Sequence, residues 1–207
     1  MEGLGLGGEV RNRIGGAWVA GAGEVVELID PFEDAPLIAY RDAGAELAAE
    51  ACEAAKAAQR DWAARTGAVR GVALHVVAAA VTEAAEPLAR LEALSAGKPI
   101  RDCRVEVAKV AEMFAYYAGW ADKRHGEVIP APPGHLVYTL REPLGVVFQI
   151  TPWNAPVFTA GWQIAPALAA GNGVVLKPSE LTPLTTLALV ALAEERAGLP
   201  KGLVNVL

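Results

Sequence analysis

The chain has 207 residues, 18 of them basic and 24 acidic, which gives a net charge of -6 at neutral pH. This length suffices for one domain, or one and a fraction, that buries about 70% of its unfolded surface. The acidic balance provides no basic surface for phosphate backbones or anionic lipids, so we expect neither nucleic acid nor a membrane as a partner.

Cys52 and Cys103 lie far apart and match no metal or redox spacing, which excludes a disulfide scaffold and predicts reduced thiols in a cytoplasmic protein. The amino terminus lacks a basic segment followed by an apolar core, so we expect no secretion signal. The run from Pro143 to Leu176 is uncharged, but its prolines and glycines would break hydrogen bonds that lipid cannot replace. We therefore expect no membrane span, and the scattered histidines predict no metal site.

Residues 9–29 alternate short apolar runs with glycines, which predicts one or two small hairpins rather than a core strand. Asp30-Pro31 is expected to end this segment. Residues 42–65 are rich in Ala, Glu, Lys and Leu with a 3.6-residue apolar period, which predicts a surface helix. Its apolar face is expected to comprise Leu47, Ala51, Ala54, Ala55, Ala58 and Trp62.

Three more helices are predicted before residue 124. The second covers 68–85, and Pro87 fits the first turn of a third, which ends at Gly97-Lys98-Pro99. The fourth covers 100–123. Its buried stripe is expected to be Val107, Val110, Ala111, Phe114, Tyr117 and Ala118, with Met113, Tyr116 and Trp120 adding bulk. These aromatic residues fit either the core or a substrate tunnel, and helical spacing favours the core.

The second half of the chain is strand-rich. Residues 135–141 alternate in polarity, which predicts a half-exposed strand that pairs outside the core sheet. Near-continuous apolar runs, typical of strands covered on both faces, occupy 144–150, 173–176 and 203–207. Helices are expected between them, over 157–170 and from Thr182 as N-cap and Pro183 as first helical residue to Gly198. This order predicts an α/β fold with a partial, parallel, Rossmann-like sheet preceded by a helical region.

Ligands bind sheets of this kind beyond the carboxyl ends of the strands. At the first end, Asn154 lies between two prolines that restrict its backbone, so its amide can be aimed at a developing oxyanion. The alternative is that Asn154 only caps a turn. At the second end, Lys177 and Glu180 suit ribose hydroxyls, and the carboxylate would repel a 2′-phosphate, which favours NAD over NADP. The alternative is a surface ion pair worth at most about 1 kcal/mol.

Several stretches together resemble the aldehyde dehydrogenase superfamily. They are Pro143-Leu-Gly-Val, Ile150-Thr-Pro-Trp-Asn154 and the segment from Ala165 to Glu180, supported by Gly97-Lys98-Pro99, residues 116–123, Thr182-Pro-Leu-Thr185 and residues 197–206. The resemblance covers nearly the whole chain. It implies NAD(P)-dependent oxidation of an aldehyde to a carboxylic acid.

The resemblance also implies roles for single residues. Asn154 would be the oxyanion-hole amide, and Trp162 and Ala155 would line the aldehyde tunnel. The cofactor would be held by Ile150, Thr151, Pro152 and Trp153 at the nicotinamide half and by Lys177, Ser179 and Glu180 at the adenosine ribose. Ala155 stands where the family usually has phenylalanine, which should widen the tunnel, and Gln163 replaces a usual lysine whose role stays open.

The family's catalytic cysteine and glutamate follow the point at which this sequence stops, and Cys52 and Cys103 match no family motif. The resemblance therefore implies the amino-terminal portion of an aldehyde dehydrogenase, inactive by itself, that forms a homo-oligomer or associates with a complementing chain. Residues 1–134 would belong to the cofactor domain, 135–142 to the oligomerisation element and 143–207 to the first half of the nucleotide-binding sheet, the catalytic domain being absent.

Two other interpretations remain. One is a catalytically inert nucleotide-binding or assembly module, and the other is a hydrolase that uses Cys103, which lacks an adjacent activating group. The last apolar run, 203–207, would be an unpaired sheet edge, which predicts an aggregation-prone or associated chain.

Overall fold

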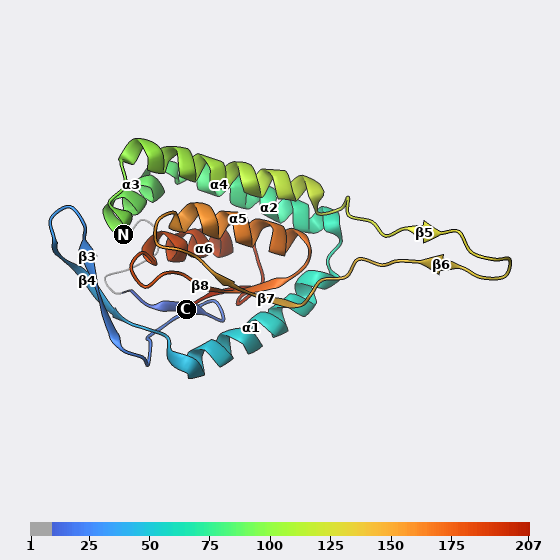
Figure 1. Cartoon of the computed structure of the whole chain (residues 1–207), viewed down its shortest axis with the longest axis horizontal. Coiled ribbons are helices and arrows are strands. Elements are labelled where there is room, and N and C mark those ends of the chain that lie inside the picture. The colour runs from blue at the N-terminus through green and yellow to red at the C-terminus, as the bar shows by residue number, and fades with distance from the viewer. Residues whose placement is uncertain (1–9) are drawn as a thin grey trace.

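The computed structural model describes residues 10–207, so the expectation about a secretion signal lies outside the described residues. The elements, drawn in Figure 1, are β1 (Asn12–Ile14), β2 (Ala17–Val19), β3 (Val25–Asp30), β4 (Ala35–Arg41), α1 (Gly44–Ala64), α2 (Gly67–Glu83), α3 (Ala85–Ala96), α4 (Ile100–Trp120), β5 (Val128–Ile129), β6 (Val137–Tyr138), β7 (Val146–Ile150), α5 (Pro156–Ala169), β8 (Gly173–Lys177), α6 (Leu184–Ala197) and β9 (Val204–Val206).

The main sheet has five strands in the order β2-β1-β9-β8-β7. β7, β8 and β9 are parallel, as the strand-helix-strand-helix-strand pattern predicted, while β1 and β2 are antiparallel additions. Helix α1 covers one face of the sheet and α5 and α6 the other, with α2, α3 and α4 packed beyond them (Figure 1). The α/β expectation is confirmed, and the core fills both sides of β8.

The first hairpin, formed by β1 and β2, departs most from the prediction of small hairpins outside the core, because β1 belongs to the main sheet. β1 is buried along its length and pairs with β9 through Arg13 and Val206. The Gly15 N–H also donates to the Asn205 side-chain oxygen at 2.8 Å. The prediction of an unpaired edge at 203–207 is therefore wrong, because a segment about 190 residues earlier covers it. The reason for predicting aggregation is removed as well, because the outer strand on that side is now β2, which has only three residues.

Asp30-Pro31 ends β3, as predicted, and does so in a turn. The Asp30 carboxylate accepts hydrogen bonds from the N–H groups of Phe32 and Glu33, which is how an aspartate closes a tight turn. The chain then returns as β4, which pairs antiparallel with β3 in a separate two-stranded sheet. β4 was not predicted, although its alternation around Tyr40 carried the signal.

The helices begin and end within a few residues of the predicted positions. Leu47, Ala51, Ala55 and Trp62 are buried on α1, whereas Ala54 and Ala58 are only half-buried. On α4 the predicted stripe is buried except for Tyr117, which is half-buried. The core interpretation of the α4 aromatic residues holds for Phe114 but not for Tyr116 and Trp120, which are exposed by 60% and 50%.

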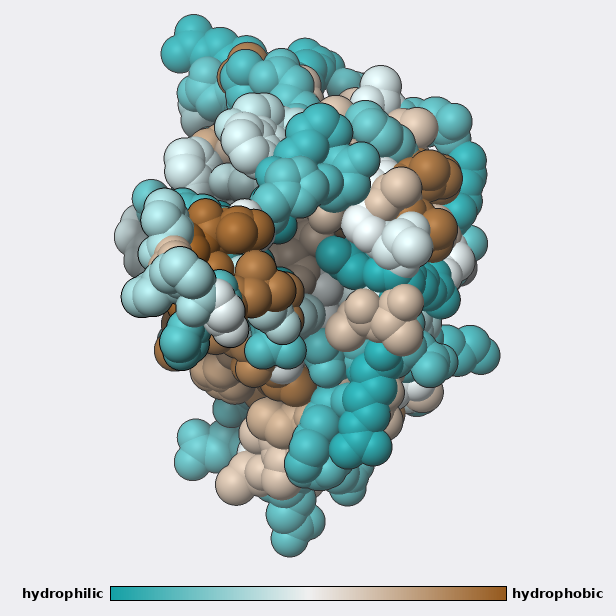
Figure 2. Space-filling view, turned by 90° about the vertical axis from the view of Figure 1, so that its right-hand side faces the viewer, coloured by the Kyte–Doolittle hydropathy of each residue, from teal (hydrophilic) through white to brown (hydrophobic). Residues whose placement is uncertain are grey.

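Residues 135–141 pair outside the core sheet, as predicted, since β6 pairs with β5. The resulting arm extends away from the body in Figure 1. The expectation of a half-exposed strand is wrong because every residue from 122 to 142 is exposed in this chain. Figure 2, which views the molecule from the side of the arm, shows hydrophobic residues among those on this surface. They include Val128, Leu136 and Leu140.

Within the described part of the chain, no single helix has the length and apolar character needed to cross a membrane. The bent pair α1 and α2 meets the length and composition criteria only when its two helices are taken together.

Candidate functional site

The two predicted strand ends lie side by side. Ile150 and Lys177 are register partners at the carboxyl ends of β7 and β8, and the Thr151 N–H donates to the Lys177 carbonyl at 3.2 Å. Because the strands are parallel, the loops 151–155 and 178–183 leave the same edge of the sheet. Residues predicted separately at each loop thus lie at one edge of the sheet.

The loop after β8 presents an ion pair. Lys177 Nζ lies 2.8 Å from Glu180 Oε2, with the two side chains 36% and 54% exposed. The hydrogen bond from Lys177 lowers the pKa of Glu180, so this carboxylate is ionised at neutral pH. The Ser179 hydroxyl accepts from the Leu181 N–H at 3.3 Å, which makes it part of the turn. An exposed ammonium and carboxylate can together donate to and accept from a vicinal diol.

Tyr40 on β4 supports this loop from a distant part of the sequence. Its hydroxyl donates to the Glu180 carbonyl at 3.2 Å. Burial raises the pKa of Tyr40, and the charges of Asp42 and Glu180 raise it further, so the phenol remains a neutral donor. We did not predict this contact, because nothing local in the sequence indicates a bond between residues 140 positions apart.

The loop after β7 is held through its backbone. The Trp153 carbonyl accepts from the Thr182 hydroxyl at 3.2 Å, and the Ala155 carbonyl accepts from the Thr159 N–H at 2.9 Å as α5 begins. The prediction that Thr182 is the N-cap of α6 and Pro183 its first helical residue is therefore wrong. The helix begins at Leu184, and Pro183 is its N-cap residue. In place of the predicted cap, the Thr182 hydroxyl bonds to the other loop.

Asn154 is exposed, and within residues 10–207 its side chain makes no hydrogen bond. A turn-capping role would require a bond from this amide to a nearby backbone group. The geometry therefore favours the alternative in which the amide is available to a ligand.

The other predicted residues at this end differ in exposure. Ile150 and Trp153 are exposed by 66% and 58%, and Pro152 is also exposed. Thr151 is buried, with 2% of its surface exposed. On α5, Ala155 at the N-cap is half-buried, and Trp162 is 55% exposed with its ring 5.6 Å from that of Phe158. The loop and the first turns of α5 thus present apolar and aromatic surface around Asn154.

Gln163 ties α5 to the end of β7. Its side-chain N–H₂ donates to the Ile150 carbonyl at 3.4 Å, and its own carbonyl accepts from the Gln149 amide at 2.9 Å. The residue whose role was left open by the sequence thus fixes the helix that follows the loop. Two side-chain amides make these contacts, Gln163 to the Ile150 backbone and Gln149 to the Gln163 backbone, and each donates to a carbonyl oxygen.

The described residues contain no cluster of three or more His, Cys, Asp or Glu side chains suited to a metal ion. Cys103 is fully buried, and burial raises the pKa of its thiol. A protonated, enclosed thiol is a poor nucleophile, which removes the support for a hydrolase. Cys52 is half-buried on α1.

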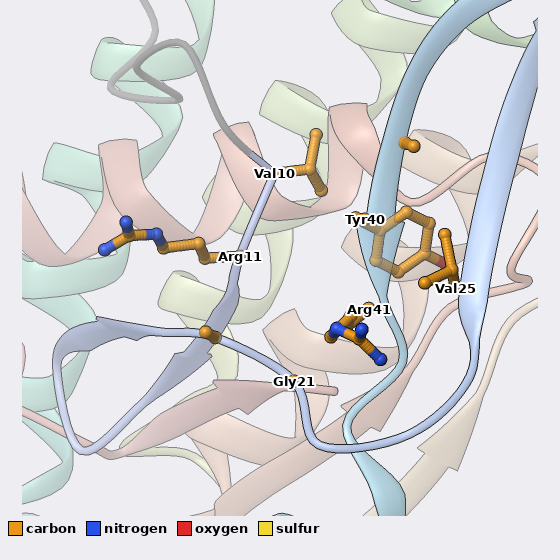
Figure 3. Close-up of a pocket in the computed structure, with 8 residues that line it drawn as sticks. Val10, Arg11, Gly21, Val25, Tyr40 and Arg41 are labelled. Atoms are coloured by element: carbon orange, nitrogen blue, oxygen red, sulfur yellow. The ribbon is translucent and has the colours of Figure 1, made fainter.

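A pocket of about 300 Å³ lies between the two amino-terminal hairpins (Figure 3). It is lined by Val10, Arg11, Ala20, Gly21, Val25, Ala39, Tyr40 and Arg41. In Figure 3 the Arg11 guanidinium points away from Tyr40, so the two arginines do not converge on one ligand. Tyr40 connects this pocket to Glu180, but the pocket contains none of the predicted site residues.

Comparison with known proteins assigns this geometry to a family. The family model described as "Aldehyde dehydrogenase family" matches residues 18–207. The chain belongs to the aldehyde dehydrogenase family. The recognition made from the strand-end motifs is therefore confirmed, as is the fold class.

Individual relatives agree. The betaine aldehyde dehydrogenase of Bacillus subtilis is 42% identical over 197 residues, which cover 93% of this chain and 40% of that protein. The crystal structure of betaine aldehyde dehydrogenase from Staphylococcus aureus in complex with NAD⁺ has 40% identity and a TM-score of 0.91 over 95% of this chain and 40% of its own. An aldehyde dehydrogenase structure from Burkholderia cenocepacia has a TM-score of 0.93 and 40% identity over 96% of this chain and 42% of its own. The chain thus spans about two fifths of these relatives.

Proposed function

We propose that this chain is the amino-terminal, cofactor-binding portion of an NAD-dependent aldehyde dehydrogenase that oxidises an aldehyde to a carboxylic acid. The observation that carries the proposal is the shared edge of β7 and β8, where the exposed Asn154 amide and the Lys177–Glu180 pair leave the sheet together. The NAD⁺ complex of the S. aureus relative supports the choice of cofactor.

Each residue has a defined task in this proposal. Glu180 accepts hydrogen bonds from the ribose hydroxyls and Lys177 donates to them, which fixes the adenosine half of the cofactor. Trp153 and Ile150 offer apolar surface to the nicotinamide half. When bound, NAD⁺ supplies the hydride acceptor. The ionised Glu180 disfavours a 2′-phosphate at the same place, so NAD is preferred over NADP.

Asn154 acts on the aldehyde. When a nucleophile adds to the carbonyl carbon, negative charge develops on the oxygen, and a fixed amide donor stabilises that charge. Removing one such donor costs about 10²- to 10³-fold in kcat. The nucleophile and the base are not assigned to any residue of this chain, so the chain alone is not expected to turn over.

The aldehyde is expected to be bulky or cationic. Ala155 is small and leaves space beside the loop, and Trp162 offers an exposed indole face. Quaternary ammonium groups bind to such faces through cation–π attraction. Betaine aldehyde, the compound in the name of the B. subtilis relative, is therefore the first substrate to test, beside an uncharged aldehyde of similar volume.

The completing polypeptide is either encoded in frame or supplied by another chain, and homo-oligomerisation through the exposed arm fits either case. The DNA sequence after the Leu207 codon distinguishes these from an inert nucleotide-binding or assembly module. An in-frame region, or a partner gene, that supplies a cysteine and a glutamate supports the enzyme. A stop codon without any partner gene would overturn it.

Activity is then measured as aldehyde-dependent NADH formation by the completed protein. Asn154→Ala should lower kcat about 10²- to 10³-fold while leaving the Kd for NAD unchanged. An Asn154→Ala variant with full kcat would contradict the assigned role.

A further inference from the structure

Tyr40 contacts the loop after β8 from the hairpin of β3 and β4, and the proposed function gives this contact no task. The Tyr40 hydroxyl donates to the Glu180 carbonyl at 3.2 Å. The phenol stays protonated, and so remains a donor, because burial raises its pKa and the charges of Asp42 and Glu180 raise it further. A residue 140 positions earlier in the chain thus bonds directly to the residue proposed to hold the ribose.

The ion pair between Glu180 and Lys177 is too exposed to fix the Glu180 carboxylate by itself. The Glu180 side chain is 54% exposed and that of Lys177 is 36% exposed. Exposed ion pairs contribute little, because water screens the charges and two long side chains lose freedom. The position of the carboxylate therefore depends on the backbone that carries it. The Tyr40 bond acts on that backbone, at the carbonyl of the same residue.

Other bonds of this loop hold the positions on either side of Glu180. The Thr182 hydroxyl donates to the Trp153 carbonyl at 3.2 Å, and the Thr182 N–H donates to the Ser179 carbonyl at 3.1 Å. These bonds fix Ser179 and Thr182, the former one residue before Glu180 and the latter two residues after it. Tyr40 supplies the side-chain bond at Glu180 itself.

The hairpin gives Tyr40 a fixed position. Tyr40 is the register partner of Val26 in the pairing of β4 with β3. Just beyond it, the Asp42 N–H donates to the Glu24 carbonyl at 2.9 Å, and the Gly23 N–H donates to the Asp42 carbonyl at 2.8 Å. These bonds close the base of the hairpin, and β3 also contacts α3. Tyr40 therefore connects Glu180 to a part of the chain that is itself held in place.

We propose that Tyr40 is a positioning residue that sets the selectivity for NAD over NADP by holding the Glu180 backbone. Selectivity is a difference between two affinities. A fixed Glu180 carboxylate accepts a hydrogen bond from the 2′-hydroxyl of NAD and repels the 2′-phosphate of NADP. A carboxylate that moves away from the ribose loses part of both effects. The consequence for cofactors rests on the proposed function, whereas the effect on the loop is a property of the chain alone.

The first part of the test is hydrogen–deuterium exchange of the chain without cofactor. Tyr40→Phe removes the hydroxyl and keeps the ring, so we expect exchange in 179–182 to rise by about fivefold while α1 keeps its protection. Tyr138→Phe makes the same change at an exposed position on β6 and should leave this loop unchanged. Wild-type exchange in the loop of Tyr40→Phe would overturn the proposal. So would an equal rise in α1, which would mean that Tyr40 only stabilises the fold.

The second part is calorimetric titration of the same chains with NAD and with NADP. Tyr40→Phe should raise the Kd for NAD more than the Kd for NADP, which narrows their ratio by about threefold. Tyr138→Phe should keep the wild-type ratio. If the wild-type chain prefers NAD but Tyr40→Phe leaves the ratio unchanged, the role of Tyr40 is refuted and the proposed function stands. If the wild-type chain does not bind NAD, or binds both cofactors equally, the proposed function fails and the role of Tyr40 fails with it.

Discussion

Thr182 donates its hydroxyl hydrogen to the carbonyl oxygen of Trp153 at 3.2 Å, and this bond joins the loop after β8 to the loop after β7. The two residues are 29 positions apart; Trp153 directly precedes Asn154, and Thr182 lies two residues after Glu180. A side-chain donor that holds a backbone carbonyl leaves the neighbouring Asn154 side chain exposed. The Thr182 bond thus links the two loops, and the Asn154 amide is exposed beside it.

Thr182→Val should loosen this loop. Valine has nearly the shape of threonine but no donor, so the Trp153 carbonyl loses its bond at a cost of about 1 kcal/mol. We expect faster exchange in 151–156 and weaker NAD binding by about fivefold. Thr186→Val is the matched control, because Thr186 is also a buried threonine, four residues later on α6, and its hydroxyl has no partner among residues 10–207. An equal loss of NAD affinity in Thr182→Val and Thr186→Val would show that the Thr182 bond is unimportant.

Gly161→Ala should destabilise the contact between α4 and α5. A Cβ at this position would lie 2.7 Å from Val110 Cγ1 and 2.9 Å from Cγ2, closer than packed carbons approach. Overpacking of this kind costs about 1–3 kcal/mol of unfolding free energy, measured by urea titration. Val110→Ala in the same chain should recover part of this loss.

Gly119→Ala provides the control for that measurement. Gly119 also lies in a helix, but nothing lies within 4 Å of its Cβ position. Alanine should therefore stabilise the chain by about 0.5–1 kcal/mol through helix propensity. If Gly161→Ala and Gly119→Ala change the unfolding free energy in the same direction, the close approach of α4 and α5 does not decide the outcome.

The Glu86 carboxylate should make stability depend on acid. Arg104 and Arg90 hold it by hydrogen bonds of 2.8 to 2.9 Å and lower its pKa from 4.5 to about 2. A lowered folded-state pKa contributes stability that is present above pH 4.5 and is lost as the pH falls toward 2. The urea midpoint of wild type should therefore exceed that of Glu86→Gln near neutral pH, and the gap should close in acid. Because the group is exposed, about 1 M salt should also close it. A difference in urea midpoint that changes with neither pH nor salt would contradict the role assigned to Glu86.

Trp62→Phe should weaken the link between α1 and the end of α5. The Trp62 indole N–H donates to the Leu168 carbonyl at 2.8 Å in a fully buried position. The Leu168 carbonyl retains a bond from the Gly171 N–H, so we expect a loss near 2 kcal/mol from the bond and the lost volume. Trp120→Phe, at a half-exposed position, should change the unfolding free energy by less than about 0.5 kcal/mol. Equal losses would be inconsistent with the structure.

The sequence predicted most of the elements whose signals are local. Pro87 does lie in the first turn of α3, and Gly97 and Gly198 do end their helices in the left-handed conformation. The apolar runs 144–150 and 173–176 became adjacent parallel strands, which placed Asn154 and Glu180 at one edge. Periodicity and turn chemistry suffice for these features because they depend on neighbours in the chain.

The missed features depend on contacts between distant segments. β1 pairs with β9 nearly two hundred residues later, and the Tyr40 hydroxyl bonds to Glu180, 140 residues later. Thr182 was expected to cap its own helix and instead bonds to Trp153. Nothing in a local window distinguishes a threonine that caps from one that reaches another loop, since the same hydroxyl serves both.

The pairing of β9 also changes an expectation about cofactor binding. An uncovered 203–207 edge would favour aggregation, which competes with binding of NAD. Because β1 covers that edge, the candidate half-site rests on a five-stranded sheet in which β9 is paired on both sides. Binding by the chain itself is therefore a fair test.

Calorimetric titration of the chain with NAD and with NADP tests the central claim most directly. We predict that NAD binds, that NADP binds more weakly, and that Glu180→Gln narrows this difference while Lys177→Met weakens both. At a concentration 100 times its Kd, NAD should also raise the unfolding free energy by about 2.7 kcal/mol. Undetectable binding of NAD, or equal binding of both cofactors by the wild-type chain, would contradict the assignment of the β7–β8 edge as an NAD site.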